Sequence, residues 1–345
     1  MNLQVINPLD YRDWDEMLLS THGYSFFHTS HWARVLHESY GYRPLYFSVI
    51  KGGSLHFCLP FMEIRSRLTG KRGVSLPFTD YCDPVSDGGL HFQDMIGCLT
   101  EYGRRSGWKF IEMRGGGEVV FKTVHPYSKY YGHTLGLAED EDGIYSLFRS
   151  STQRNIRRAE REGVRVSVFG TLEAVREFYR LNCLTRRMHG LPPQPYFFFR
   201  KIFEHIISRN HGMVILARYK GQAVAGAVFF HFGKKAVYKY GASDKRYQHL
   251  RANNLVMWRA IREYCSRGYK RFCFGRTETG NRGLRQFKNG WGASEEIIRY
   301  YRYDCRRGSF VIGDPHVPEF HNKVLNKMPV SVLRMIGSVL YKHVG

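Results

Sequence analysis

Acidic residues are scarce in this sequence. It has 30 Asp and Glu against 52 Lys and Arg over 345 residues, which gives a formal net charge of +22. A positive field of this size favours anionic partners such as nucleic acid, anionic lipid or a phosphorylated substrate. Part of the excess also serves solubility, and composition alone does not choose among the anions.

Paired cysteine motifs and metal-binding motifs are absent. The 7 cysteines never show Cys-x-x-Cys spacing, and their odd number leaves at least one unpaired, which predicts a reducing compartment. The 16 histidines form no His-Glu-x-x-His motif, so we expect no metal. A Gly-x-Ser-x-Gly elbow and a phosphate-binding P-loop are also missing.

Long apolar runs are missing as well. The N-terminus has no basic region followed by an apolar core, and no run approaches the roughly 18 residues that span a bilayer. We therefore expect a cytoplasmic protein, with association at a membrane surface left open. Hydrophobic residues make up 43% of the chain, which is typical of a globular protein, and the length favours two domains.

The chain repeats one pattern of elements. In each half, two apolar runs joined by a glycine turn are followed by a helix, a glycine and a further strand. This order predicts an α/β fold (α+β mixed sheet) with helices covering the faces, present in two copies. We place the domains at 1–142 and 143–310, with a basic amphipathic tail at 311–345, and expect a central interdomain cleft.

One stretch places a single lysine between glycines and aromatic residues. A strand ending in Phe-Gly-Arg-Thr (274–277) is followed by a glycine-rich bend and by Phe-Lys-Asn-Gly-Trp-Gly (287–292). This pattern resembles the Fem-type (FemAB-like) branch of the GNAT acyltransferase superfamily, whose members attach amino acids to peptidoglycan precursors or acylate other amines. The resemblance implies tandem GNAT-like domains.

The same resemblance gives Lys288 a catalytic role, with Phe287 as its motif partner. It places the lysine beside the acyl-transfer centre, where a fixed ammonium stabilises the tetrahedral oxyanion. We therefore expect replacement by methionine to remove transfer activity and to leave stability nearly intact. On spacing alone, the alternative is a surface lysine on a loop before an edge strand.

Two further residues of the second half are candidates for the catalytic site. Arg276 ends an apolar strand, where side chains emerge at a ligand site, and its alternative is a salt bridge with Glu278 or Glu295. Tyr240 offers a hydroxyl that orients an amine, although aromatic residues on strands usually pack.

Substrate-binding candidates come from both halves. Arg154, Arg157 and Arg158 share one face of a predicted helix, and arginine forks suit diphosphate or tRNA phosphates; a solvated charged face is the alternative. In the first half, Trp32 followed by Arg34 resembles the Fem segment whose basic residue holds precursor phosphates. The family-like loop 75–84 adds Asp80 and Tyr81 as further substrate-binding candidates.

The donor and the C-terminal tail remain open at this stage. The acyl-CoA loop of ordinary GNAT enzymes would fall at 246–251, where both motif glycines are missing. We expect no bound cofactor and a donor co-substrate that is either aminoacyl-tRNA or acyl-CoA. Residues 322–342 carry four Lys and Arg and no acid, so this tail either packs on the protein or lies on an anionic membrane.

Together these features predict a Fem-like GNAT N-acyl- or aminoacyltransferase. Its acceptor would be an amine of a phosphorylated or lipid-linked cell-envelope precursor of peptidoglycan or polysaccharide, and tRNA is a candidate partner. One alternative is an acyltransferase that uses acyl-CoA or an acyl carrier in exopolysaccharide biosynthesis. Another is a non-catalytic, basic RNA- or membrane-binding protein.

Overall fold

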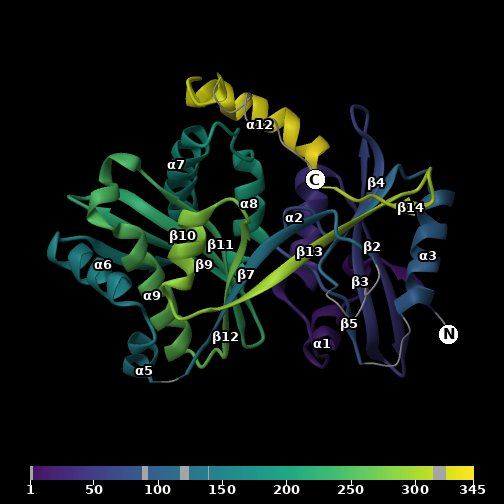
Figure 1. Cartoon of the computed structure of the whole chain (residues 1–345), viewed down its shortest axis with the longest axis horizontal. Helices are drawn as coiled ribbons and strands as arrows, with labels where there is room; N and C mark the ends of the chain where they lie inside the picture. Colours follow the sequence, from purple (N-terminus) through teal and green to yellow (C-terminus); the bar gives the residue numbers. More distant parts are fainter. Residues whose placement is uncertain (1–2, 88–91, 117–123, 139, 314–323) are drawn as a thin grey trace. The chain divides into compact units, whose positions relative to one another are not determined.

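The chain forms two compact units in a computed structural model that describes residues 3–87, 92–116, 124–138, 140–313 and 324–345 (Figure 1). Unit 1 comprises residues 1–130, 297–316 and 340–345, and unit 2 comprises 131–296 and 317–339. The units are discontinuous because β13 (Ser294–Asp304) pairs antiparallel with β6 (Phe110–Arg114) and so returns to unit 1. They therefore divide the chain differently from the continuous domains 1–142 and 143–310, which remain a prediction.

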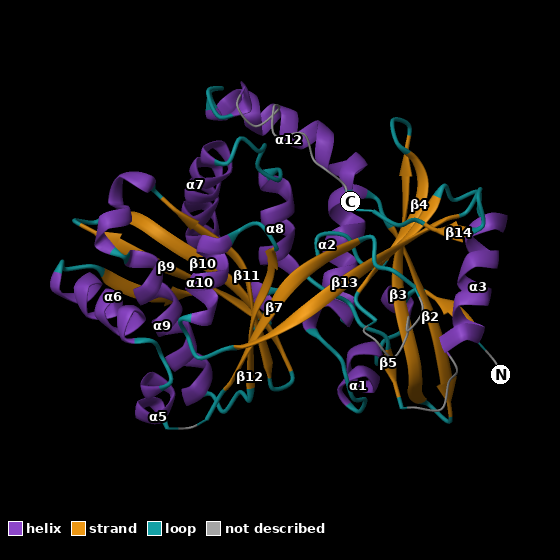
Figure 2. Cartoon of the chain, viewed as in Figure 1, coloured by secondary structure: helices purple, strands orange, loops and turns teal. Residues whose placement is uncertain are grey.

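Unit 1 is a mixed sheet with helices on it (Figure 2). Large apolar side chains of its central hairpin, such as Phe47 and Phe61, form the core with Leu99 of the third helix and with Trp108. The strands in sheet order are β1 (Gln4–Ile6), β2 (Arg43–Lys51), β3 (Ser54–Ser66), β4 (Gly70–Val74), β6 and β13, with β5 (Val85–Ser86) beside β3 and β14 (Ser309–Phe310) beside β13. The helices are α1 (Trp14–Leu19), α2 (Ser30–Tyr40) and α3 (Phe92–Arg105).

Unit 2 repeats the arrangement. In sheet order these are β7 (Ser128–Gly136), β12 (Arg271–Glu278), β11 (Lys235–Ser243), β10 (Gln222–Phe232), β9 (Gly212–Tyr219) and β8 (Arg165–Phe169). Its helices are α5 (Glu141–Ser146), α6 (Ser150–Arg161), α7 (Leu172–Met188), α8 (Tyr196–His205), α9 (Ala252–Ser266), α10 (Arg282–Asn289) and the first part of α12 (Val330–Val344).

The repeat predicted from the sequence is confirmed. The hairpins β2–β3 and β9–β10 are both antiparallel, and each is extended by a third strand that pairs in parallel with the strand after the helix, β4 with β6 and β11 with β12. A parallel pair needs a crossover helix, which α3 and α9 supply.

The sheet of unit 2 is covered on both faces. Ala225 and Ala227 of β10 belong to a buried cluster with Ile156 of α6 and Ile261 of α9. Gly226 faces the other side, where a Cβ atom would come into contact with Phe178 of α7. Alternate residues of one strand therefore serve two helical layers.

The 7 cysteines all lie in described segments, and each is free. Among the helices formed by described residues, none has the length and apolar character that a bilayer span requires.

Candidate functional site

A β-bulge in β11 changes which side chains reach each face of the sheet. The register with β10 shifts by one between Tyr238 and Tyr240, so Lys239 is the extra residue. A bulge re-aims the side chains that follow it. Tyr238 packs against Phe229 in the cluster on the α9 side, whereas Tyr240 packs against Phe199 of α8. Tyr240 is thus part of an aromatic layer, and an orienting role for its hydroxyl remains a prediction.

Strands β11 and β12 separate at this bulge. Their parallel pairing covers Lys235–Val237 and Arg271–Cys273 among the described residues, although β11 continues to Ser243 and β12 to Glu278. Where two strands separate, their main-chain N–H and C=O groups no longer form hydrogen bonds with each other. These groups can then bind a ligand in the split. This split is the geometric centre of the candidate site.

The end of β11 is held firmly. Thr185 of α7 exchanges two hydrogen bonds with Ser243, donating to its carbonyl oxygen at 3.1 Å and accepting from its N–H at 3.0 Å. Asp244 then caps the 3-10 helix η4 (Lys245–Leu250). Arg251 follows with φ of 58° and leads into α9. Arg251 thus holds the left-handed conformation that glycine adopts most easily, at one of the two positions where the acyl-CoA loop motif has a small residue.

A pocket of about 140 Å³ opens at the beginning of α9. Free N–H groups at a helix N-terminus favour anions, so the position suits the phosphate groups of a donor. Phe287 of α10 forms one wall, which brings the Phe-Lys motif beside this helix. The other lining residues are Val224, Ala225, Ser243, Tyr247, Gln248, Arg251, Ala252, Asn253 and Asn254.

Lys288 lies near the end of α10 and is buried, with 2% of its surface exposed. Its Nζ donates to the carbonyl oxygens of Gly275 at 2.9 Å and Arg276 at 2.8 Å. These bonds attach α10 to β12 on the far side of the split. The lysine is therefore a fixed cation inside the fold and not an exposed loop residue. Its loss would leave two carbonyl groups without this donor, which contradicts the expectation of nearly unchanged stability.

A charged network surrounds Lys288 in unit 2. Arg285 binds both carboxylate oxygens of Glu295, at 2.7 and 2.6 Å, and these bonds are the largest cause that lowers the pKa of Glu295 to about 2. His133 of β7 is fully buried and lies 3.1 Å from Glu295 through Nε2. Burial, followed by the positive charge of Lys288, lowers the pKa of His133, so its imidazole is neutral near pH 7.

The pairing of His133 with Glu295 is not visible in the sequence. They are 162 positions apart and lie in strands β7 and β13, which only the folded sheet brings together. The sequence offers Glu295 as a salt-bridge partner of Arg276, and in the structure Glu295 binds Arg285. A histidine preceded by glycine in a strand carries no signal that distinguishes it from a core residue.

The basic face of α6 is present as predicted from the spacing. Arg154 and Arg157 are exposed, and Arg158 is partly exposed with its Nε 3.8 Å from Glu162. The opposite face is buried in the core of unit 2. The three guanidinium groups therefore point away from the core, where an anionic ligand can reach them.

The remaining predicted residues belong to unit 1. Trp32 is fully buried and packs edge-on against Phe27, at 5.7 Å between ring centroids, which makes it a core residue of α2. Arg34 is partly exposed on the same helix. The main-chain oxygen of Asp80 accepts a 2.6 Å hydrogen bond from the Tyr300 hydroxyl, and the neighbouring Tyr81 is partly exposed.

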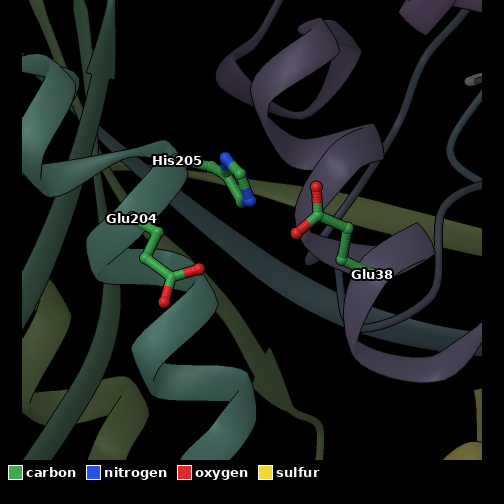
Figure 3. Close-up of side chains that lie close together, drawn as sticks. All are labelled: Glu38, Glu204 and His205. Carbon is green, nitrogen blue, oxygen red and sulfur yellow. The ribbon is translucent and has the colours of Figure 1, made fainter.

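Figure 3 shows Glu204 and His205 at the end of α8 and Glu38 on α2. Glu204 binds Lys201 of its own helix at 2.7 Å. Because the three side chains come from both units, we assign no metal site to them, and the absence of a metal remains a prediction.

Comparison with known proteins agrees with the architecture. Residues 146–289 match the family described as Acetyltransferase (GNAT) domain. No curated protein matches the chain. Among solved structures, the chain is similar to FemX, with a TM-score of 0.68, 13% identity, and coverage of 86% of this chain and 96% of FemX.

Two further structures are similar over most of their length. A tandem GNAT protein from the clavulanic acid biosynthesis pathway has a TM-score of 0.55 and 9% identity, with 88% of this chain and 98% of that chain covered. The C-terminal domain of a putative lysylphosphatidylglycerol synthetase from Agrobacterium fabrum has a TM-score of 0.51 and 14% identity, with 79% and 86% covered.

These matches confirm the predicted fold class, which is a tandem GNAT-like arrangement of mixed α/β sheets. The match of residues 146–289 to an acetyltransferase domain supports an acyltransferase. The sequence match is to the broad GNAT family and does not select its Fem branch.

Proposed function

We propose that this protein transfers an acyl or aminoacyl group to an amine of a cell-envelope precursor. The observation that carries the proposal is the split between β11 and β12, with the buried cation of Lys288 fixed to one of the separated strands. An acyl carbonyl in the split would meet main-chain donors and a nearby positive charge. Both stabilise the negative charge that develops on its oxygen.

The reaction needs no covalent enzyme intermediate. The acceptor amine attacks the activated carbonyl carbon, and the tetrahedral intermediate carries its charge on oxygen. Collapse breaks the bond to the leaving sulfur or oxygen, and the proton lost by the amine is balanced by protonation of that leaving group. Lys288 acts on the developing charge, while Arg276 and Phe287 shape the β12 and α10 walls of the site.

The donor with the stronger support is acyl-CoA. The GNAT domain match implies it, and the pocket at the beginning of α9 provides main-chain N–H groups for donor phosphates. Aminoacyl-tRNA is the second candidate, favoured by the exposed arginines of α6 and by the resemblance to Fem-type enzymes. The likenesses to FemX and to a putative lysylphosphatidylglycerol synthetase support a cell-envelope acceptor.

Mass spectrometry of amine-bearing precursors tests the proposal. Peptidoglycan and polysaccharide precursors are incubated with the protein and either acyl-CoA or charged tRNA. We expect one acceptor to gain the mass of one acyl or aminoacyl group, at a rate proportional to protein concentration. Failure of every acceptor amine to gain mass with both donors would contradict the function.

A further inference from the structure

Helix α12 packs on unit 2 with one face and leaves an apolar stripe on the other. Leu333 and Gly337 are buried, and a Cβ atom on Gly337 would overlap the main chain of Pro193. Met335 and Val339 lie four residues apart on the outer face, where Met335 is 64% exposed and Val339 is 56% exposed. The first part of α12 is thus docked, but Met335 and Val339 stay exposed among the described residues.

The charge of this segment has one sign. Lys327, Arg334 and Lys342 are its Lys and Arg residues within 324–345, and that range contains no Asp or Glu. A helix that combines an exposed apolar stripe with basic residues is suited to the interface of an anionic membrane, where apolar burial and electrostatic attraction add. A protein partner would need an acidic groove, whereas a lipid surface supplies the same charge without shape matching.

A pocket of about 380 Å³ lies between α12, the middle of α7 and the start of α8. The guanidinium of Arg334 lies 5.5 Å from the Tyr179 ring. Burial raises the pKa of the Tyr179 phenol, and the positive charge of Arg334 opposes this rise without cancelling it. Tyr196 lines the same pocket with a buried hydroxyl that has no hydrogen-bond partner in the described part of the chain. A guanidinium and hydroxyl groups around an open pocket match a phosphate group.

The residue next in sequence to Tyr196 is an exposed aromatic residue, Phe197. Phe197 is 40% exposed at the start of α8, with Arg200 and Lys201 over its ring at 5.0 and 5.4 Å. Glu204 pairs with both of these cations and reduces their net charge. The ring therefore adds an exposed aromatic group with basic neighbours at the start of α8, whose Pro195 and Tyr196 line the same pocket as Met335 of α12; α12 lies beside α8 in Figure 1.

We propose that the outer face of α12, together with the start of α8, is a docking surface for an anionic phospholipid membrane. Met335, Val339 and Phe197 enter the interfacial region, and Arg334 binds a lipid phosphate at the mouth of the pocket. None of the four residues is assigned to the acyl-transfer site, and the proposal does not depend on that function. It would bring the protein to a lipid-borne substrate without a spanning helix.

Co-sedimentation of the full chain with vesicles tests the proposal. Vesicles of phosphatidylcholine with phosphatidylglycerol should retain the protein, and vesicles of phosphatidylcholine alone should not. The double variant M335E/V339E should bind the anionic vesicles at least about tenfold more weakly, because two charges enter the apolar interface. Arg334→Gln should weaken binding about fivefold, since one basic residue near the surface contributes about 1 kcal/mol.

The control carries the same charge change at two exposed apolar residues elsewhere, L147E/I297E, and should bind as the parent does. Melting curves of all variants verify folding, and M335Q/V339N serves as a milder pair if the glutamates unfold the helix. The proposal is overturned if the α12 variants bind like the parent or if both vesicle types bind equally. It is also overturned if the stripe instead binds a second copy of the chain. In that case light scattering would show a dimer of the parent protein that M335E/V339E dissociates, and the parent would not bind vesicles.

Discussion

At the residue scale, Lys288 shows what sequence and structure each contribute. Its glycine- and tryptophan-flanked motif identified it as the residue to follow. Its burial and its bonds to Gly275 and Arg276 became visible only in the fold. The spacing of the motif does not show whether the lysine is buried. Burial depends on which face of the helix packs against the rest of the protein.

Replacing Lys288 should therefore affect both rate and stability. We expect Lys288→Met to lower the transfer rate by at least about a hundredfold and the free energy of unfolding by about 3 kcal/mol, since two carbonyl groups lose a charged donor. Lys288→Gln keeps a donor without the charge, so it should recover part of the stability and none of the rate. Urea unfolding and kcat measurements separate the two effects. Full activity in the folded Gln variant would exclude a role for the ammonium charge.

A second residue-scale prediction concerns His231. Its Nε2 lies 2.7 Å from the main-chain oxygen of Asn210, and its Nδ1 lies 3.1 Å from the Tyr264 hydroxyl. Burial lowers the pKa of His231 to about 4. The unfolded chain, with a histidine pKa near 6.5, binds this proton first, so stability is full above about pH 6.5 and falls as the pH drops towards 4.

This histidine should account for about 3 kcal/mol of the stability lost between pH 7 and pH 4. Urea unfolding at the two pH values measures the loss in the parent and in His231→Gln. The variant should show a smaller loss, and the carboxylates that also titrate in this range act equally in both proteins. An equal loss in parent and variant would assign the acid sensitivity to other groups.

At the element scale, glycine positions predicted the hairpins and crossovers, but the bulge in β11 escaped prediction. Tyr238 and Tyr240 alternate in the sequence, which places them on one face of a regular strand. The extra residue Lys239 moves them to opposite faces. A bulge is set by the pairing with β10, so the alternation within β11 alone cannot reveal it.

The basic face of helix α6 gives a prediction at this scale. Replacing Arg154, Arg157 and Arg158 with Gln should weaken binding of the anionic substrate or tRNA and flatten its salt dependence. The slope of log K against log salt should fall by about 2 to 3, close to one unit per lost phosphate contact. The matched control R65Q/R105Q/R307Q makes the same charge change on exposed arginines of unit 1. Identical slopes in both triple variants would mean that the α6 face is only solvated.

At the scale of the whole molecule, length and repetition predicted two similar halves but not their discontinuity. The chain leaves unit 2 in β13 and returns to unit 1 because β13 completes the pairing of β6. Long-range pairing of this kind depends on which edge strand still has unpaired main-chain groups once the other strands have paired. No local pattern in residues 294–304 indicates that partner.

The central claim is that the acyl group binds in the split between β11 and β12. It is tested by a donor, either coenzyme A or tRNA, that carries a photoreactive acyl group, followed by peptide mapping of the labelled protein. The account predicts labels within residues 238–243 and 274–288, reduced by an excess of unmodified donor. Specific labelling that is confined to unit 1, and is lost to the same competitor, would place the acyl group elsewhere and contradict the account.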